Sequence, residues 1–460
     1  MRILHAIHDF LPRHRAGSEI YACDLAREQR RRHDVFVVAA EYDPATAHGT
    51  LRWREYAGLT VIELVNNWEF DRFEDSYASE RINAQLRHVL AATAPDVLHV
   101  HNLLNLSFDL PRQAKQRGAG TVATLHDYTL VCASGGQRVH ASDQHVCHEI
   151  DPGRCARCFS ESPFSRQMAA GRLTRGPAGP LLGRSGRALR RLAPRLANSA
   201  ARAIDAGVVE AGDLRRRGAY ARGVFEAIDL FVAPSRFIGD EFVRLGAPRD
   251  RLQIADYGFA PQTPQRRPFR SPTDPLRIGF VGTLVWHKGV HVLVDAFRAL
   301  DGHCELHVHG DTGVFPEYAA RLRAAAGRAP VVFHGGFGQE HAGEIYGSLD
   351  VLVVPSLWPE NSPLVIHEAF IHGVPVVAAR VGGIPELIEH EVNGLLYEPA
   401  CSVEALRESL DRLLADRTLI ERFAHAMPDV KTIAADAIEW DARYAQIAPD
   451  ASKPAAMAAP

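Results

Sequence analysis

Short runs of β-branched and other apolar residues alternate with longer amphipathic stretches along most of the chain. This alternation predicts strands that lie parallel in a sheet and are joined by crossover helices. Two successive sets of strands are expected. The first set is 2–7, 35–40, 97–101, 122–125 and 230–233, and the second is 277–281, 305–309, 331–333, 351–354 and 374–378. We therefore predict an α/β protein with two Rossmann-like domains, each built on a doubly wound parallel sheet.

Length and proline content predict the domain boundaries. A chain of 460 residues is too long for one ordinary core and suits two α/β domains. Residues 261–275 are polar and rich in proline, which disfavours a helix or a central strand, so they are predicted to link the domains. The other predicted parts are a first domain at 1–260, a second domain at 276–432, a helix at 433–447 that returns to the first domain, and a disordered tail at 448–460.

The overall composition is that of a soluble globular protein, with 46% hydrophobic and 23% charged residues. The formal net charge of −3 gives no reason to expect a nucleic acid partner. The first nine residues predict a buried strand rather than a signal peptide, and we find no apolar run of about 18 residues. We therefore expect a cytoplasmic protein.

One stretch, at 166–222, departs from the strand and helix alternation because it is rich in arginine, glycine and proline. Leucines are interleaved there with Arg187, Arg190, Arg191 and Arg195. An arginine-rich amphipathic helix can lie on an anionic membrane surface, which would give peripheral contact with the inner membrane face. The alternative is a solvated helix on a long insertion into the first domain, at about 130–222.

The same insertion carries four of the seven cysteines, Cys132, Cys147, Cys155 and Cys158. The last two have the spacing of many zinc sites, and zinc commonly takes four thiolates. A structural zinc, free thiols and a disulfide all remain open, and His140, His145 and His148 are alternative ligands. A metal here would order the insertion and take no part in catalysis. The other cysteines, Cys23, Cys304 and Cys401, are isolated.

The most informative segment, at 355–369, follows the expected strand at 351–354 and so lies where α/β proteins bind ligands. Ser362 is a suitable helix N-cap and Pro363 a suitable first helical residue. Glu360 then lies in the loop and Glu368 in the second turn of the helix, so both carboxylates can accept hydrogen bonds from hydroxyl groups of one extended ligand. The helix N-terminus between them suits a phosphate.

Two further loops in the second domain are expected to meet this segment. The loop at 279–289 carries Lys288, which can meet phosphate charge, and the loop at 382–386 offers flexible glycine amides before a helix. Taken singly, each feature has an ordinary interpretation, as a turn, a solvated lysine or a surface acid. Their order and spacing within one domain favour a ligand site.

Glu360 and Glu368, separated by seven residues, together with the loops at 282–289 and 382–386, resemble the glycosyltransferase family 4 pattern. That resemblance implies a GT-B fold, a retaining reaction and a nucleotide-diphosphate-sugar donor. It implies that Glu368 binds the ribose hydroxyls, that Glu360 holds the transferred sugar and that Lys288 neutralises the diphosphate. Further donor contacts implied by the resemblance are Gly17, Gly282, Thr283, Asn361, Ser362, Pro363 and Leu364. The family usually has an arginine at the position of Thr283, so either His287, Arg236 or another basic group compensates, or turnover is slow.

His126 ends the strand at 122–125 and resembles the family's histidine beside the sugar, which makes it a catalytic candidate together with Glu360 and Lys288. The alternative is that His126 only hydrogen-bonds backbone at a strand end. In a retaining enzyme of this type the leaving diphosphate helps to deprotonate the acceptor, and the protein positions and stabilises. No Asp-x-Asp pair suggests a metal-bound diphosphate, so no cofactor is expected for catalysis.

The sequence thus predicts a retaining glycosyltransferase that acts on a glycan or lipid-linked acceptor, in cell-surface polysaccharide synthesis by resemblance. Two alternatives remain open. One is a nucleotide-sugar epimerase on the same fold. The other is a non-catalytic nucleotide-sugar binding protein, for which the missing charge at Thr283 is the main support.

Overall fold

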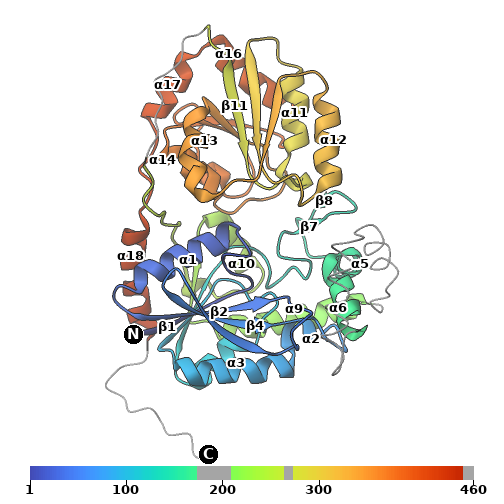
Figure 1. The fold of residues 1–460 in the computed structure, drawn as a ribbon, viewed down its shortest axis with the longest axis vertical. Helices are drawn as coiled ribbons and strands as arrows, with labels where there is room; N and C mark the ends of the chain where they lie inside the picture. The colour runs from blue at the N-terminus through green and yellow to red at the C-terminus, as the bar shows by residue number, and fades with distance from the viewer. Residues whose placement is uncertain (174–208, 264–272, 449–460) are drawn as a thin grey trace, which may run out of the picture.

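The computed structural model describes residues 1–173, 209–263 and 273–448. Two α/β domains, each with its own sheet, lie one above the other with the N-terminal domain below (Figure 1). The linker residues 264–272, the tail 449–460 and the arginines Arg187, Arg190, Arg191 and Arg195 lie outside the described residues. Among the helices that are described, every one is too short or too polar to cross a membrane.

The N-terminal sheet has the strand order β10-β9-β6-β5-β1-β2-β4-β3. Its strands are β1 (Arg2–Ile7), β2 (Asp34–Glu41), β3 (Leu51–Tyr56), β4 (Leu59–Val65), β5 (Val97–Val100), β6 (Gly120–Thr124), β9 (Leu230–Ala233) and β10 (Leu252–Ile254). All pairs are parallel except the β3–β4 hairpin. The first set of strands predicted from the sequence lacks β3, β4 and β10. Strand β3 lies at the sheet edge and is only partly buried, so its charged residues hide the apolar pattern that marks the central strands.

The C-terminal sheet has the order β13-β12-β11-β14-β15-β16, with every pair parallel. Its strands are β11 (Leu276–Val281), β12 (Cys304–His309), β13 (Val331–Gly335), β14 (Val351–Val354), β15 (Val376–Ala379) and β16 (Gly394–Tyr397). The helices are α11 (Val290–Arg298), α12 (Pro316–Ala326), α13 (Ala342–Ser348), α14 (Leu364–Ile371), α15 (Ile384–Leu387), α16 (Val403–Ala415) and α17 (Thr418–His425). The two sheets confirm the predicted α/β class, and each domain has its own apolar core.

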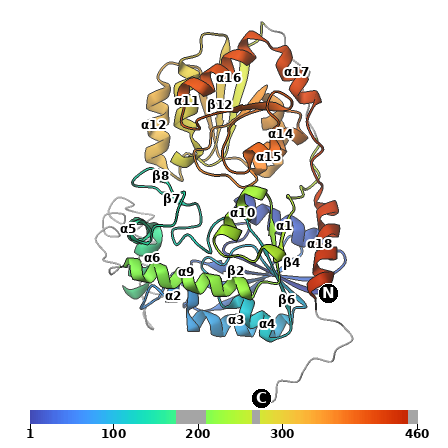
Figure 2. The ribbon, with the colours of Figure 1, turned by 180° about the vertical axis from the view of Figure 1, so that it is seen from behind.

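Outside the insertion, the described helices of the N-terminal domain are α1 (Gly17–Gln29), α2 (Asp75–Ala78), α3 (Glu80–Thr93), α4 (Leu110–Gln116), α9 (Ala211–Glu226) and α10 (Arg236–Arg244). The last described helix, α18 (Ile433–Ile447), crosses back and lies beside α1 in both views (Figure 2). The buried Tyr21 hydroxyl donates to Asp436 Oδ2 at 2.7 Å and accepts from Trp440 Nε1 at 2.9 Å. These buried contacts tie α18 to the N-terminal domain.

The insertion between β6 and β9 starts with a small hairpin and two helices. The hairpin is formed by β7 (Val139–His140) and β8 (His145–Val146), and the helices are α5 (Pro152–Glu161) and α6 (Pro163–Leu173). Helix α5 packs against α9. The hairpin rises from this part of the N-terminal domain toward α12 of the other domain (Figure 1).

Candidate functional site

Three loops of the C-terminal domain meet at one edge of its sheet because they follow adjacent strands. The loops at 282–289, 355–363 and 380–383 leave β11, β14 and β15, which are neighbours in the sheet. Two glycines allow the loops to touch. A Cβ on Gly289, where φ is +70°, would lie 1.8 Å from the Pro355 carbonyl oxygen. A Cβ on Gly382, where φ is +58°, would lie 2.1 Å from the Glu360 carbonyl oxygen.

Helix α14 begins one residue later than the sequence predicts. The sequence predicts Ser362 as the cap, but Pro363 occupies the cap position, with an extended ψ of 117°, and Leu364 is the first helical residue. Ser362 Oγ instead donates to Asp256 Oδ1 at 2.7 Å and lies 2.9 Å from His367 Nε2. The expected cap was wrong because a residue distant in sequence takes the hydroxyl, which a local capping rule cannot detect.

Glu360 lies in the loop before α14 and is paired with Lys288. Its carboxylate accepts from Lys288 Nζ at 2.7 Å and from Ser356 Oγ at 2.6 Å. The exposed fraction of the side chain is 6% for Glu360 and 28% for Lys288. Burial alone would raise the pKa of Glu360, but the charge and hydrogen bond of Lys288, with the Ser356 hydroxyl, outweigh burial and lower the pKa. Glu360 is therefore ionised at neutral pH.

Glu368 lies on α14 and faces α13 and the short turn before it. Its carboxylate accepts from Tyr346 Oη at 2.6 Å and from Gln339 Nε2 at 2.8 Å. Burial raises the pKa of Glu368, although these hydrogen bonds oppose the rise. Within the described parts of the chain no lysine or arginine is hydrogen-bonded to this carboxylate, in contrast to Glu360. The two acids of the predicted pair therefore have different electrostatic surroundings.

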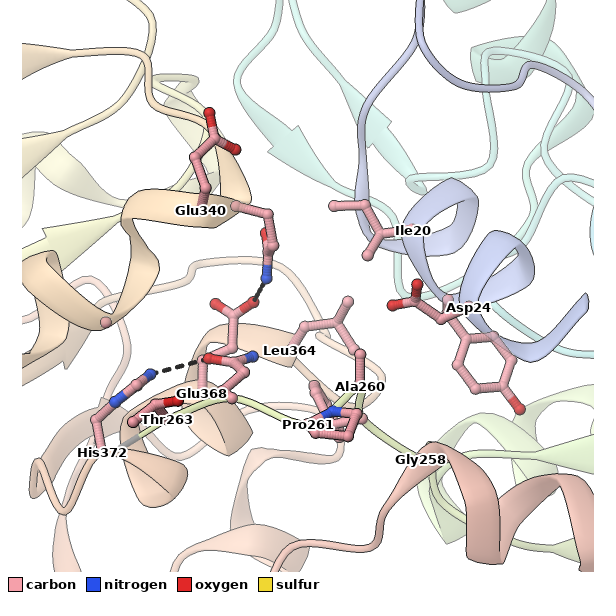
Figure 3. A pocket seen from close by; sticks show the side chains of 15 residues that line it. Ile20, Asp24, Gly258, Ala260, Pro261, Thr263, Glu340, Leu364, Glu368 and His372 are labelled. Carbon is pink, nitrogen blue, oxygen red and sulfur yellow. Dashed lines mark hydrogen bonds between the residues drawn. The ribbon is translucent and has the colours of Figure 1, made fainter. Parts of the chain in front are cut away.

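A pocket of about 460 Å³ lies between the domains and includes Glu368 and Leu364 in its wall. Ile20 and Asp24 of α1 face these residues across the pocket, and Glu340 lies at its rim (Figure 3). The segment at 258–263 closes another side. Glu360 and Lys288 do not line this pocket. Within the segment at 355–369, which we call the acidic segment, Glu368 therefore faces the pocket and Glu360 does not. Both domains contribute walls to the pocket, as in the interdomain ligand sites of α/β proteins.

His126 follows β6, and both of its ring nitrogens have partners. Nδ1 lies 2.9 Å from Tyr257 Oη, and Nε2 lies 2.9 Å from His101 Nδ1. The Tyr257 ring also stacks on the imidazole at a centroid distance of 5.4 Å. Burial lowers the pKa of His126 to about 3, with a smaller effect from the charge of His8. His126 is therefore a neutral, held side chain, and its contacts extend beyond the backbone at the strand end.

A chain of hydrogen bonds continues from His126 into the domain. His101 Nε2 lies 2.9 Å from His5 Nδ1, and His5 Nε2 lies 2.8 Å from Gln29 Oε1. Because an amide oxygen only accepts, His5 donates through Nε2, and each histidine along the chain then donates through Nε2 and accepts at Nδ1. Gln29 therefore sets the tautomer of His126.

His5, His99 and His101 place one ring nitrogen each within 4.8 Å of the others, a spacing that a metal ion could use. The nitrogens already have partners, however. His99 bonds Tyr444 Oη and Thr124 Oγ1, both at 2.7 Å. Hydrogen bonds thus account for this buried group without a cation.

We expect these buried histidines to make the protein less stable in mild acid. Burial lowers the pKa of His5 to about 4 and lowers the pKa values of His99 and His101. Below about pH 6.5 each of these histidines is protonated in the unfolded chain but stays neutral in the folded chain. Each therefore lowers the free energy of unfolding by roughly 1.4 kcal/mol for every pH unit below that point. For His5 this loss ends near its folded pKa.

Urea denaturation at several pH values measures the effect. His5→Gln should flatten the dependence between about pH 6.5 and pH 4, whereas replacing the exposed His88 in the same way should leave it unchanged. Equal slopes for the wild type and His5→Gln would contradict the expectation.

Asn361 joins the acidic segment to the N-terminal domain. Its Oδ1 accepts from Ser235 Oγ at 2.8 Å, and its Nδ2 donates to the Leu125 carbonyl oxygen at 2.8 Å. Glu386 accepts from the first two backbone amides of α10, at 2.7 and 2.9 Å. The loop after β14 and helix α15 therefore contact residues that follow β6 and β9 in the N-terminal domain, which brings His126 and the acidic segment to the same interdomain region.

The remaining predicted donor contacts lie on both sides of the cleft. Gly17 begins α1, and a Cβ there would lie 3.0 Å from Leu364 Cδ1. Gly282 and Thr283 follow β11, and Thr283 is exposed. His287 is buried, and burial lowers its pKa to about 4, so it cannot supply the charge that an arginine at Thr283 would give. Arg236 is exposed at the start of α10, and its backbone amide donates to Glu386 of the other domain.

Gly382→Ala is expected to disturb the Glu360 loop. The added methyl would overlap backbone and would force alanine into the left-handed region, at a combined cost of roughly 2–5 kcal/mol. Gly118→Ala is a matched control, because Gly118 has φ +85° but a methyl added there would meet nothing within 4 Å. Thermal unfolding should show a larger loss for Gly382→Ala, and equal losses would contradict the packing argument.

Sequence reasoning missed the residues that hold the predicted ones in place. Tyr257 stacks on His126, Tyr346 bonds Glu368 and Ser356 bonds Glu360. Ser356 lies in the loop just after β14, so its place at a strand end was a usable signal. The two tyrosines gave no such signal, since they come from distant segments.

Comparison with known proteins covers most of the chain. Residues 15–204 match the family model described as Glycosyltransferase Family 4, and residues 261–429 match the model described as Glycosyl transferases group 1. An uncharacterized glycosyltransferase of Methanocaldococcus jannaschii is 35% identical over 153 residues, 33% of this chain and 39% of that protein. A D-inositol 3-phosphate glycosyltransferase of Xylanimonas cellulosilytica is 33% identical over 211 residues, 42% of this chain and 50% of that protein. The chain thus spans half or less of the length of these relatives.

Solved structures share the whole architecture at low identity. The sucrose-phosphate synthase from Thermosynechococcus elongatus has a TM-score of 0.62 and 17% identity, with 96% of this chain and 98% of that chain covered. Anabaena HepE in complex with UDP and glucose has a TM-score of 0.60 and 16% identity, with 97% and 98% covered. These likenesses establish the two-domain GT-B fold.

Proposed function

Because this chain belongs to the group 1 glycosyl transferases of the family 4 type, with a GT-B fold, we propose that it moves a sugar from a nucleotide-diphosphate-sugar donor to an acceptor hydroxyl with retention of configuration. The observation that carries the proposal is the acidic segment. Glu360 lies in the loop before α14, and Glu368 lies on α14 and lines an interdomain pocket.

Each carboxylate has surroundings that suit a different part of the donor. Glu368 accepts hydrogen bonds from an amide and a hydroxyl, both neutral groups, which suits the neutral ribose hydroxyls. Glu360 is held ionised by Lys288, and it would bind hydroxyls of the transferred sugar together with backbone groups at 361–364. The partly exposed Lys288 would stabilise the diphosphate as its charge develops on leaving.

His126 would shape and position the reacting side rather than exchange a proton. Both of its nitrogens are engaged, and burial keeps its pKa far below neutral. The leaving diphosphate is then the base for the acceptor hydroxyl, and no metal or other cofactor is required in this mechanism.

The acceptor is proposed to be a glycan or a lipid-linked glycan in surface polysaccharide synthesis. The amylovoran biosynthesis glycosyltransferase AmsK of Erwinia amylovora, 30% identical over 202 residues, supports this setting by name. We also propose a cytoplasmic location with peripheral membrane contact through the arginine-rich segment. Binding to anionic liposomes that is lost on neutralising Arg187, Arg190, Arg191 and Arg195 would support the contact, and unchanged binding would remove it.

The reaction is tested by incubating the full chain with nucleotide sugars and acceptors, with and without EDTA, and by following nucleoside diphosphate release. Nuclear magnetic resonance of the product reports the anomeric configuration. Release coupled to transfer, with the donor's configuration kept, is the expected result. Conversion of one nucleotide sugar into another would indicate the epimerase instead. Binding without either reaction would indicate a non-catalytic binding protein.

A further inference from the structure

Four cysteines from three separate segments line one small cavity of about 20 Å³ in the N-terminal domain. Cys132 lies in the loop after β6, Cys147 directly follows β8, and Cys155 and Cys158 lie on α5. Each is partly buried. All seven cysteines of the chain fall within the described residues, and none of them forms a disulfide.

Local structure turns these side chains toward one another. The Asp151 carboxylate accepts from the amides of Gly153 and Arg154 and so fixes the start of α5. Cys155 and Cys158 are then one turn apart on the same face of the helix. The Cys147 amide donates to the Arg138 carbonyl oxygen at 2.7 Å, which folds the end of the hairpin back over the cavity.

The chemistry of the cavity suits a soft cation. None of the three histidines considered as ligands lines it, and both ring nitrogens of His140 lie near carboxylates, at 3.0 Å from Asp143 and 2.9 Å from Glu161. Thiolates at four positions are the set that zinc prefers, whereas magnesium and calcium take oxygen ligands.

We propose that Cys132, Cys147, Cys155 and Cys158 bind one zinc ion as a structural site. Closely spaced potential ligands occur at three other places among the described residues, where the atoms lie within 4.8 Å of one another, and the four sulfurs are not so close. Zinc would therefore draw the sulfurs inward, as expected for a site that is completed by its metal.

Such a site would brace the loop that carries the candidate catalytic histidine. Cys132 is the sixth residue after His126, and the loop between them is also held by Arg217, which donates to the Thr129 and Leu130 carbonyl oxygens at 2.6 and 3.1 Å. The metal would join this loop to the β7–β8 hairpin and to α5. Its role is structural, because no coordination position is left open for a substrate.

Elemental analysis of the full chain purified under reducing conditions tests the proposal, with about one zinc per chain expected. Cys155→Ser and Cys158→Ser should lose the metal, whereas Cys401→Ser, at an exposed and isolated cysteine, should keep it. Because a variant could fail to fold, the wild type is also stripped with a chelator and titrated with Co²⁺ alone. Thiolate-to-cobalt charge-transfer bands with a tetrahedral spectrum are expected, and zinc should displace them.

Three results would overturn the proposal. The first is a folded wild type that contains no metal and gives no thiolate–cobalt bands. The second is iron in place of zinc at these cysteines. The third is zinc retained in full by both single variants, Cys155→Ser and Cys158→Ser. Limited proteolysis adds a readout of the structural role. Cleavage within 132–161 should rise after chelation in the wild type and should already be high in Cys158→Ser.

Discussion

Lys288→Met is expected to lower turnover by roughly 10²–10³-fold, the loss typical of removing one group that stabilises developing negative charge. Lys288 directly contacts the acidic segment, through Glu360 at 2.7 Å, and Thr283 of the same loop carries no charge. The change also leaves the buried Glu360 carboxylate without its charged partner. We expect a stability loss of about 3 kcal/mol, at the low end for buried pairs because Lys288 is partly exposed.

The double variant Lys288→Met with Glu360→Gln separates the two effects. Removing the unpaired charge should restore most of the stability, whereas turnover should remain low because the cation is still absent and Glu360 itself is proposed to hold the transferred sugar. Urea denaturation and nucleoside diphosphate release measure the two quantities. If the double variant turned over at the wild-type rate, the role of Lys288 at the diphosphate would be wrong.

Glu368→Ala is expected to raise the donor KM by roughly 10²-fold, with a smaller effect on kcat. Two ribose hydroxyls would lose their acceptor, and each hydrogen bond contributes about 0.5–1.5 kcal/mol net of the exchange with water. An interaction made equally in the ground and transition states changes KM rather than kcat. Steady-state nucleoside diphosphate release at varied donor concentration measures both constants.

Glu340→Ala is the matched control for Glu368→Ala. Glu340 lines the same pocket but is exposed and lies at its rim. Its removal should change the donor KM by less than a few-fold, in keeping with a solvated charge. Equal effects of the two substitutions would mean that the pocket responds to net charge rather than to a specific acceptor at Glu368.

Much of the fold could be predicted from sequence because the central strands are buried on both faces. Strands β9 and β14 have the bounds that their apolar runs predict, and each is buried along its whole length. Strand β3 could not be predicted in this way, since its sequence LRWREY mixes charge with aromatic residues at an edge. Its partner β4, buried over most of its length, was missed together with it.

In the candidate site, relations within one short segment could be predicted, whereas contacts between distant segments could not. The placement of Glu360 relative to Glu368 could be predicted because one strand, one loop and one helix fix it within a short segment. The partners of the site could not, because Tyr257 and Ser235 reach it only through packing of the two domains. The start of α14 was misplaced for this reason too, since Asp256 takes the hydroxyl of Ser362.

The cysteines show a similar limit. The spacing of Cys155 and Cys158 points to a metal site, and helix α5 explains the spacing as one turn. The sequence separation of Cys132 and Cys147 does not place them together. The hairpin β7–β8 does so, by returning the chain to the loop after β6.

The most direct measurement for the central claim is a thermal-shift screen of the wild type, Glu368→Ala and Glu340→Ala against a panel of nucleotide-diphosphate sugars. A ligand that binds only the folded chain raises the unfolding midpoint by mass action. We expect one donor to raise the midpoint of the wild type and of Glu340→Ala but not that of Glu368→Ala. An equal shift in all three proteins would contradict the placement of the donor at Glu360 and Glu368, and no shift with any donor at millimolar concentration would contradict the proposed function itself.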